Sequence, residues 1–141
     1  MRSLIFLLLF SSQAFGALSI RDLDGDWSNG HEGVYDDVLD ITWLADANYA
    51  FTIGVTNFGL GDGRMTWTEG NSWVDSLLID GHSLWRLPTT SLPDESCINQ
   101  EQYFGGNCTG SEMGHLFYET LENTYRSGSI NTGPFINIQI N

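Results

Sequence analysis

The chain has 141 residues, which is enough for one modest domain around a single hydrophobic core. Five basic side chains against eighteen acidic ones give a formal net charge of −13, and a surface of this sign excludes nucleic acid and anionic membranes as partners. An aromatic content of 13% supplies bulky apolar area that disordered chains lack, so the charge does not make the chain disordered.

Residues 1–16 are typical of a secretory signal peptide. Arg2 gives a charged start, residues 4–10 are an unbroken apolar run, and residues 14–16 form a small-x-small cleavage site. The apolar run is shorter than the about 20 residues of a membrane-spanning helix. We therefore expect a secreted or periplasmic protein, with residues 17–141 as one domain and no stable membrane anchor after cleavage.

The first segment after the signal peptide contains alternating aspartates, Asp22, Asp24 and Asp26, around a glycine. This pattern resembles a calcium loop, but the EF-hand register fails. The sixth position is Trp27 instead of glycine, and the twelfth is Gly33 instead of glutamate. A solvated polar turn is the favoured interpretation, so no metal is expected, and calcium binding stays the alternative.

A β-hairpin is expected next, because β-branched and aromatic residues flank an aspartate-rich middle. Its strands are residues 33–35 and 41–44, joined by a turn at 36–40, and Trp43 on the second strand is assigned to the core. One helical turn at 45–49 and a glycine-rich loop up to Gly63 are predicted to follow.

Two helices are predicted from their N-terminal signals. Thr66 and Glu69 form a capping box before a first helix that ends near Gly81, and its apolar face includes Trp67, assigned to the core. A second capping box at residues 109–112 opens a second helix, which should run to about Asn123. The final residues from Ile136 on alternate apolar and polar, as in a strand.

The run Trp85-Arg86-Leu87-Pro88 lies between the two predicted helices. Pro88 fixes its own backbone angle and biases Leu87 toward extended geometry. Arg86 presents five donors in a rigid plane, so we expect it to pair with a buried acceptor. Trp85 is assigned to the core, and the run is predicted to hold both helices to the sheet.

Two cysteines, Cys97 and Cys108, bound a polar loop. In an oxidising compartment they should form a disulfide worth roughly 3 kcal/mol, and two free thiols are the alternative. Two cysteines alone do not complete a metal site. Tyr103 and Phe104 inside the loop are the candidate binding residues, as stacking surfaces, or else they plug the loop onto the core.

Several segments fall in a recognisable order: GVYD at 33–36, ITWL at 41–44, GRMTW at 63–67, WRLPT at 85–89 and SEMGHLFY at 111–118. Together they resemble the Lcl C-terminal (DUF1566) domain family over about residues 17–138. The resemblance implies an α+β, C-type-lectin-like fold, with two short helices packed on a small antiparallel sheet. The Arg-Leu-Pro-Thr signature also occurs in formylglycine-generating-enzyme-like domains of that superfold.

Domains of this family usually continue with further strands, which carry a Tyr-Trp-Ser-type motif and a final arginine. The chain ends at Asn141 without these motifs. The C-terminal strands are therefore expected to be missing, either because the chain is shortened or because a partner supplies them.

No catalytic site or cofactor is expected. None of the three histidines lies in a nucleophile motif, and His115 with Glu119 is interpreted as a helix-surface contact in preference to half of an acid/base or metal site. The expected function is non-catalytic recognition of an unknown extracellular ligand or protein. The alternatives are a calcium-binding protein, a formylglycine-generating-enzyme-like oxidase using its cysteines, and a fragment without independent function.

Overall fold

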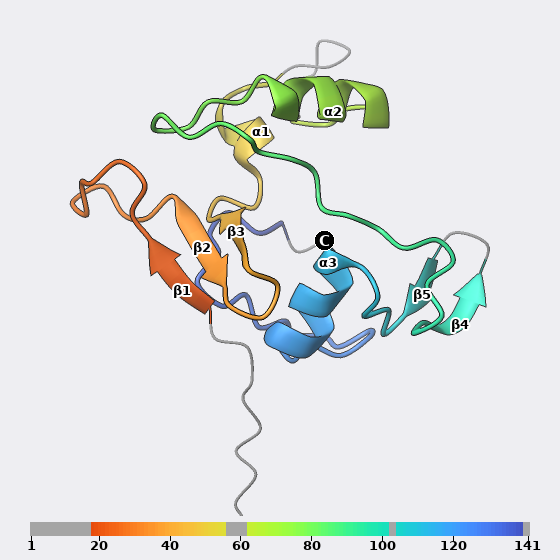
Figure 1. Ribbon diagram of the computed structural model, residues 1–141. Coiled ribbons are helices and arrows are strands. Elements are labelled where there is room, and N and C mark those ends of the chain that lie inside the picture. The colour runs from red at the N-terminus through yellow and green to blue at the C-terminus, as the bar shows by residue number, and fades with distance from the viewer. Residues whose placement is uncertain (1–17, 56–61, 102–103, 140–141) are drawn as a thin grey trace, which may run out of the picture.

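A computed structural model of the chain describes residues 18–55, 62–101 and 104–139 (Figure 1). The predicted signal peptide, residues 1–16, lies outside the described residues. The chain is a small α+β fold with a three-stranded antiparallel sheet, a separate two-stranded hairpin and a few short helices. In chain order the elements are β1 (Leu18–Arg21), β2 (Gly33–Asp36), β3 (Ile41–Leu44), α1 (Tyr49–Thr52), α2 (Trp67–Asp75), β4 (Ile98–Glu101), β5 (Phe104–Gly106), α3 (Glu112–Gly114) and the π-helix η1 (His115–Thr120).

The predicted hairpin is present as β2 and β3, with Val34 opposite Trp43. The turn is held by Asp36, whose fully buried carboxylate accepts hydrogen bonds from the backbone N–H groups of Val38 and Leu39, both at 3.1 Å. Asp40 closes the turn with a left-handed φ of 53°, which an aspartate tolerates better than most residues. Local turn chemistry therefore sets this hairpin.

Strand β1 was not predicted from the sequence. It pairs antiparallel with β2, and the sheet order is β1-β2-β3. Its sequence, Leu18-Ser19-Ile20-Arg21, alternates apolar and polar residues, but the run is only four residues long and most of it is exposed, so the pattern alone is a weak strand signal. The Arg21 guanidinium lies over the aromatic ring of Tyr35 on β2, with its central carbon 3.9 Å from the centre of the ring.

Helix α2 begins as predicted but ends early. The capping box is formed, because the Thr66 hydroxyl accepts from Glu69 N at 3.3 Å and the Glu69 carboxylate accepts from Thr66 N at 2.8 Å. The helix ends at Asp75, so the predicted end near Gly81 is wrong. Gly81 instead turns the chain, at a φ of 80°, between Ile79 and His82, which are bridged by two backbone hydrogen bonds.

The assignment of Trp67 to the core is also wrong, since this residue is 67% exposed. Its helical spacing from Val74 places both on one face, but burial along α2 begins only at Gly70. Trp67 is the first residue of the helix and extends past the packed part. The apolar spacing in the sequence therefore predicted a longer buried face than the helix has.

The second predicted helix starts and continues differently. Ser111 is the N-cap and accepts from Gly114 N at 3.1 Å, so the proposed capping box at 109–112 is wrong. The Glu112 side chain makes no return contact to the cap because it bonds elsewhere. After α3 the turns widen into η1, which closes with Leu121 N donating to Leu116 O at 2.9 Å.

Two other predicted elements, a helical turn and the C-terminal strand, also differ from the structure. The helical turn expected at 45–49 occurs as α1, Tyr49–Thr52, instead. Ile136 does not open a strand within the described residues but makes one parallel bridge to Asp46. It donates to Ala45 O at 2.9 Å and accepts from Ala47 N at 3.0 Å.

The Cys97–Cys108 disulfide is present, as predicted. The loop that it closes contains the β4–β5 hairpin, which the sequence did not indicate. Asp94 holds the base of the loop, because its carboxylate accepts from Ser96 N and Gly110 N, both at 3.0 Å. The Ser96 hydroxyl also donates to the Asp94 carboxylate, and this bond is the main cause of a lowered pKa of Asp94. The two backbone hydrogen bonds lower the same pKa further.

The hydrophobic core is small. The buried apolar residues in the described part of the chain are Val34, Ala45, Val74, Leu77, Ile79, Leu116 and Leu121. Of the tryptophans, Trp43, Trp73 and Trp85 are half-buried. Several large apolar groups therefore remain partly exposed to a space between the elements.

Candidate functional site

A largely apolar cleft of about 720 Å³ lies between the sheet and the helices. All four residues of β3 line it, together with residues 46–50 and parts of α2, η1 and the C-terminal segment. Its aromatic lining consists of Trp43, Tyr49, Trp73, Trp85, Phe117 and Phe135. Figure 1 shows the segment that follows α2 running from the upper helices toward α3, and residues 84–88 of this segment form one wall.

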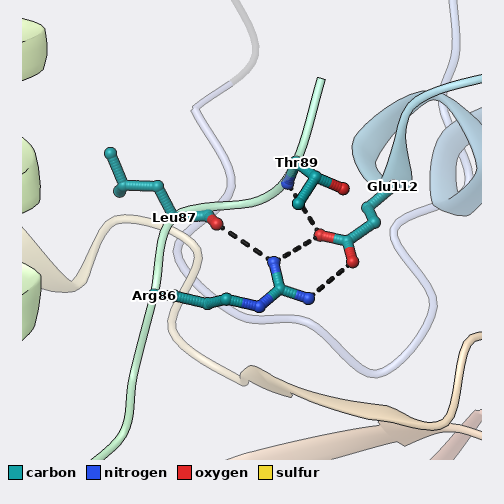
Figure 2. Close-up of polar contacts among 4 residues, drawn as sticks. All are labelled: Arg86, Leu87, Thr89 and Glu112. Atoms are coloured by element: carbon teal, nitrogen blue, oxygen red, sulfur yellow. Dashed lines mark hydrogen bonds and ion pairs between the residues drawn. The ribbon is translucent and has the colours of Figure 1, made fainter. Parts of the chain in front are cut away.

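Arg86 and Glu112 fasten that wall to α3 (Figure 2). The guanidinium donates from Nη2 to Glu112 Oε1 at 2.6 Å and from Nη1 to Oε2 at 2.7 Å. The same Oε2 accepts from the backbone N–H of Thr89 at 2.7 Å, and Nη1 also donates to Leu87 O at 3.1 Å. One carboxylate thus holds both the side chain and the backbone of the segment.

The ion pair is ionised over the whole neutral range. The Arg86 guanidinium, helped by Thr89 N, lowers the pKa of Glu112 from 4.5 to about 2. In return, the hydrogen bonds to Glu112 raise the pKa of Arg86. The Arg86 side chain is 50% exposed and the Glu112 side chain 17%, so the acceptor is half-buried.

Two cleft tryptophans differ in how their indole N–H groups are satisfied. Trp85 Nε1 donates to His82 O at 3.0 Å. Trp43 Nε1 is buried, and no acceptor for it lies within the described residues. An unpaired buried donor destabilises the folded state by the cost of its lost hydration.

This contrast gives a matched prediction. Trp43→Phe and Trp85→Phe remove the same ring area, but only the second breaks a hydrogen bond, while the first removes an unpaired donor. The loss in free energy of unfolding is therefore expected to be smaller for Trp43→Phe, by about 1 kcal/mol. Urea denaturation followed by circular dichroism measures both, and an equal or larger loss for Trp43→Phe would contradict the assignment.

The candidate binding residues predicted from the sequence are not among the described residues that line this cleft. Tyr103 lies outside the described residues, and of Phe104 only the backbone, at the start of β5, belongs to them. Figure 1 shows the β4–β5 hairpin at one end of the molecule, apart from the three-stranded sheet. Of the predicted glycine-rich loop that ends at Gly63, residues 56–61 lie outside the described residues and Gly63 lines the cleft.

A second group of polar side chains lies near β1. Carboxylate oxygens of Asp22, Asp24 and Glu32 lie within 4.8 Å of one another, and Asp26 is not among them. Asp22 Oδ1 accepts from Gly25 N at 2.6 Å, whereas Asp22 Oδ2 is buried and without a hydrogen-bond partner in the described chain. The Asn29 amide, which donates to Asp24 at 2.8 Å, is the main cause of a lowered pKa of Asp24.

Neither of the other pairings considered from the sequence forms a site in the described residues. His115 Nδ1 lies 3.4 Å from Thr120 Oγ1, and no ion pair joins His115 to Glu119. Asp94 lies near Cys97 and Cys108, but both sulfurs are used in the disulfide and offer no thiolate.

Sequence reasoning missed Glu112 as the partner of Arg86. The two residues are 26 positions apart, and the chain has eighteen acidic residues from which to choose. Sequence reasoning assigned a competing role to Glu112, because it stood in the capping box predicted at residues 109–112, whereas the structure makes Ser111 the N-cap.

Comparison with protein-family models, curated proteins and solved structures finds no match to this chain. Within the described residues, no helix is both long enough and apolar enough to cross a bilayer.

Proposed function

We propose that the chain is an exported, non-catalytic recognition domain of C-type-lectin-like fold, and that the cleft beside β3 is its binding site. The observation that carries the proposal is the cleft itself. At about 720 Å³ it falls within the range of roughly 300 to 1,000 Å³ typical of ligand sites, and aromatic residues line it with few polar groups. Its Arg86–Glu112 wall supplies a fixed polar element.

Export is proposed on two grounds. Residues 1–16 have the pattern of a signal peptide, and the Cys97–Cys108 disulfide suits an oxidising compartment such as the periplasm or the extracellular space. The similarity of segments such as WRLPT at 85–89 to Lcl C-terminal domains supports the same class of exported domain. An oxidase that uses cysteine is disfavoured, because both thiols are joined to each other.

The proposal is tested with a neutral apolar dye, N-phenyl-1-naphthylamine, whose fluorescence rises on entering an apolar site. Met113 lines the cleft and is 51% exposed, so Met113→Arg places a charge at the site without removing buried packing. Leu78, which is 67% exposed and does not line the cleft, provides the matched control Leu78→Arg.

The wild-type protein and Leu78→Arg are expected to bind the dye alike, and Met113→Arg at least about tenfold more weakly, the effect of 1.4 kcal/mol. Circular dichroism confirms that both variants are folded. Equal dye binding by the two arginine variants would show that the cleft is not the site.

Calcium binding near β1 is a second candidate function. The observation that favours it is the buried, unpartnered Oδ2 of Asp22 beside the carboxylates of Asp24 and Glu32, since calcium prefers carboxylate oxygens. Calorimetric titration with calcium should then show binding that Asp22→Asn abolishes and Asp26→Asn retains. An absence of heat at millimolar calcium would remove this candidate.

A further inference from the structure

We infer that the cleft binds an extended peptide segment of another protein, with apolar side chains in its centre and basic residues at its ends, which adds to β3 as a fourth strand. The inference rests on the proposed function, because it takes the cleft as the binding site and names the class of ligand. It depends on the open edge of β3, on the lining of the cleft and on the charge of the chain.

Strand β3 is an edge strand. The sheet order is β1-β2-β3, and no strand within the described residues pairs with the other side of β3. In an antiparallel pair, the backbone N–H and C=O groups of every second residue point to the partner strand. Ala45 N donates to Glu32 O, just beyond β2, at 2.8 Å, so the backbone groups of Trp43 and Ile41 also point to β2. The backbone groups of Thr42 and Leu44 therefore point to the open side.

The open side of β3 faces the cleft. Residues 41–44 all line it, although side chains along a strand alternate between the two faces of the sheet, so the cleft lies along the edge of this strand. Just beyond β3, Ala45 and Ala47 exchange backbone hydrogen bonds with Ile136 in one isolated parallel bridge. A peptide that pairs with Thr42 and Leu44 along the open side of β3 satisfies these backbone groups and covers the aromatic lining, as in other cases of strand addition.

The charged side chains that line the cleft favour a basic residue at an end of the peptide. Three charged side chains line the cleft, and Arg86 and Glu112 neutralise each other. Asp46, directly after β3, is a carboxylate without a cation within the described residues, although it accepts hydrogen bonds from Asn48 N, Thr52 Oγ1 and Asn137 Nδ2. A lysine or arginine at one end of the peptide balances it.

The net charge of the chain points to the same partner. At −13 the protein attracts a basic segment from a distance and repels a second copy of itself. A basic partner is therefore favoured over self-association as the occupant of the cleft.

Three synthetic peptides test the inference with the full-length folded protein. The first has a core of alternating valine and threonine between paired lysines. The second has the same side chains with N-methyl groups on alternate core residues, which removes backbone donors. The third replaces the lysines by glutamates. Binding is followed by quenching of tryptophan fluorescence at low and at physiological salt, and displacement of N-phenyl-1-naphthylamine locates the peptide in the cleft.

The lysine peptide is expected to bind and to displace the dye, with the N-methylated and the glutamate peptides at least about tenfold weaker. Asp46→Asn should weaken binding of the lysine peptide and reduce its dependence on salt, whereas Asp80→Asn, an exposed change outside the cleft lining, should do neither. Equal binding of the lysine and N-methylated peptides would overturn strand addition.

The outcomes separate this inference from the proposed function. If the dye binds in the cleft and none of the peptides displaces it, the inference fails and the recognition site stands. If neither the dye nor a peptide binds, both fail. If the protein forms dimers in which the dye is excluded, a second copy occupies the cleft and the inference is overturned.

Discussion

Replacing Cys97 and Cys108 together by serine is expected to lower the free energy of unfolding by about 3 kcal/mol, the loop-closure contribution of a bridge that spans 11 positions. The loop carries the β4–β5 hairpin and is tied to α3, because Gly114 packs against the carbonyl oxygen of Cys108. Losing the bridge therefore loosens the approach to α3 as well. With a small core, a loss of this size is a large share of the total stability.

Guanidinium denaturation of the wild-type protein and the Cys97→Ser/Cys108→Ser variant, with and without a reductant, measures this contribution. Reduced wild type should unfold at the same midpoint as the variant, and the reductant should leave the variant unchanged. A variant as stable as the oxidised wild type would show that the bridge does not stabilise the fold.

Glu112→Gln is expected to destabilise the protein by about 1 to 2 kcal/mol at pH 7, because it weakens two charge-assisted bonds to Arg86 and one to Thr89 N. The shift in the pKa of Glu112 alone would indicate a larger effect, but the guanidinium is half exposed and solvent screens the pair. Glu119→Gln, an exposed change on η1, should alter stability by less than about 0.5 kcal/mol.

The same pair predicts a pH dependence. The pKa of Glu112 is lower in the folded state, about 2, than its ordinary value of 4.5. Its stabilisation is therefore complete above pH 4.5 and is lost as the pH falls toward 2. The stability difference between wild type and Glu112→Gln should shrink across this window, and a difference that stays constant from pH 6 to pH 2 would contradict the assignment.

Arg86→Leu completes a double-mutant cycle with Glu112→Gln. Each single variant should lose stability, and the double variant should lose less than the sum, because the two residues share one interaction. An Arg86→Leu variant with an unchanged thermal melt would mean that the segment at 84–88 is held by other contacts.

Features with a local physical cause could be predicted from the sequence. The β2–β3 hairpin follows from an aspartate-rich turn between β-branched residues, and the start of α2 follows from the reciprocal bonds of Thr66 and Glu69. The disulfide follows from two cysteines in a chain with an export signal. In each case the deciding contacts lie within about a dozen residues.

Features set by distant contacts could not be predicted. Strand β1 is a run of only four mostly exposed residues, and it exists because β2 offers it a backbone ladder. Where α2 ends and how much of Trp67 is covered depend on which other segments reach the helix. The widened turns of η1 likewise have no signal in the apolar spacing of Leu116 and Leu121.

The candidate site was predicted only in part. The Trp85–Pro88 run was predicted to hold both helices to the sheet, and in the structure it forms one wall of the cleft and is joined to α3 by the Arg86–Glu112 pair. The binding role was assigned instead to Tyr103 and Phe104, since aromatic residues in a disulfide-bounded loop are a local pattern. The cleft arises where β3, α2 and η1 meet, and no local pattern encodes such a junction.

Hydrogen exchange of individual backbone amides in the free protein, followed by NMR, tests most directly that β3 presents an open edge to the cleft. The amides of Thr42 and Leu44 are expected to exchange nearly as fast as those of exposed loops, while the amide of Trp43, paired with β2, is protected. Strong protection of Thr42 and Leu44 as well would mean that this edge is already covered, and would contradict the addition of a peptide strand to β3.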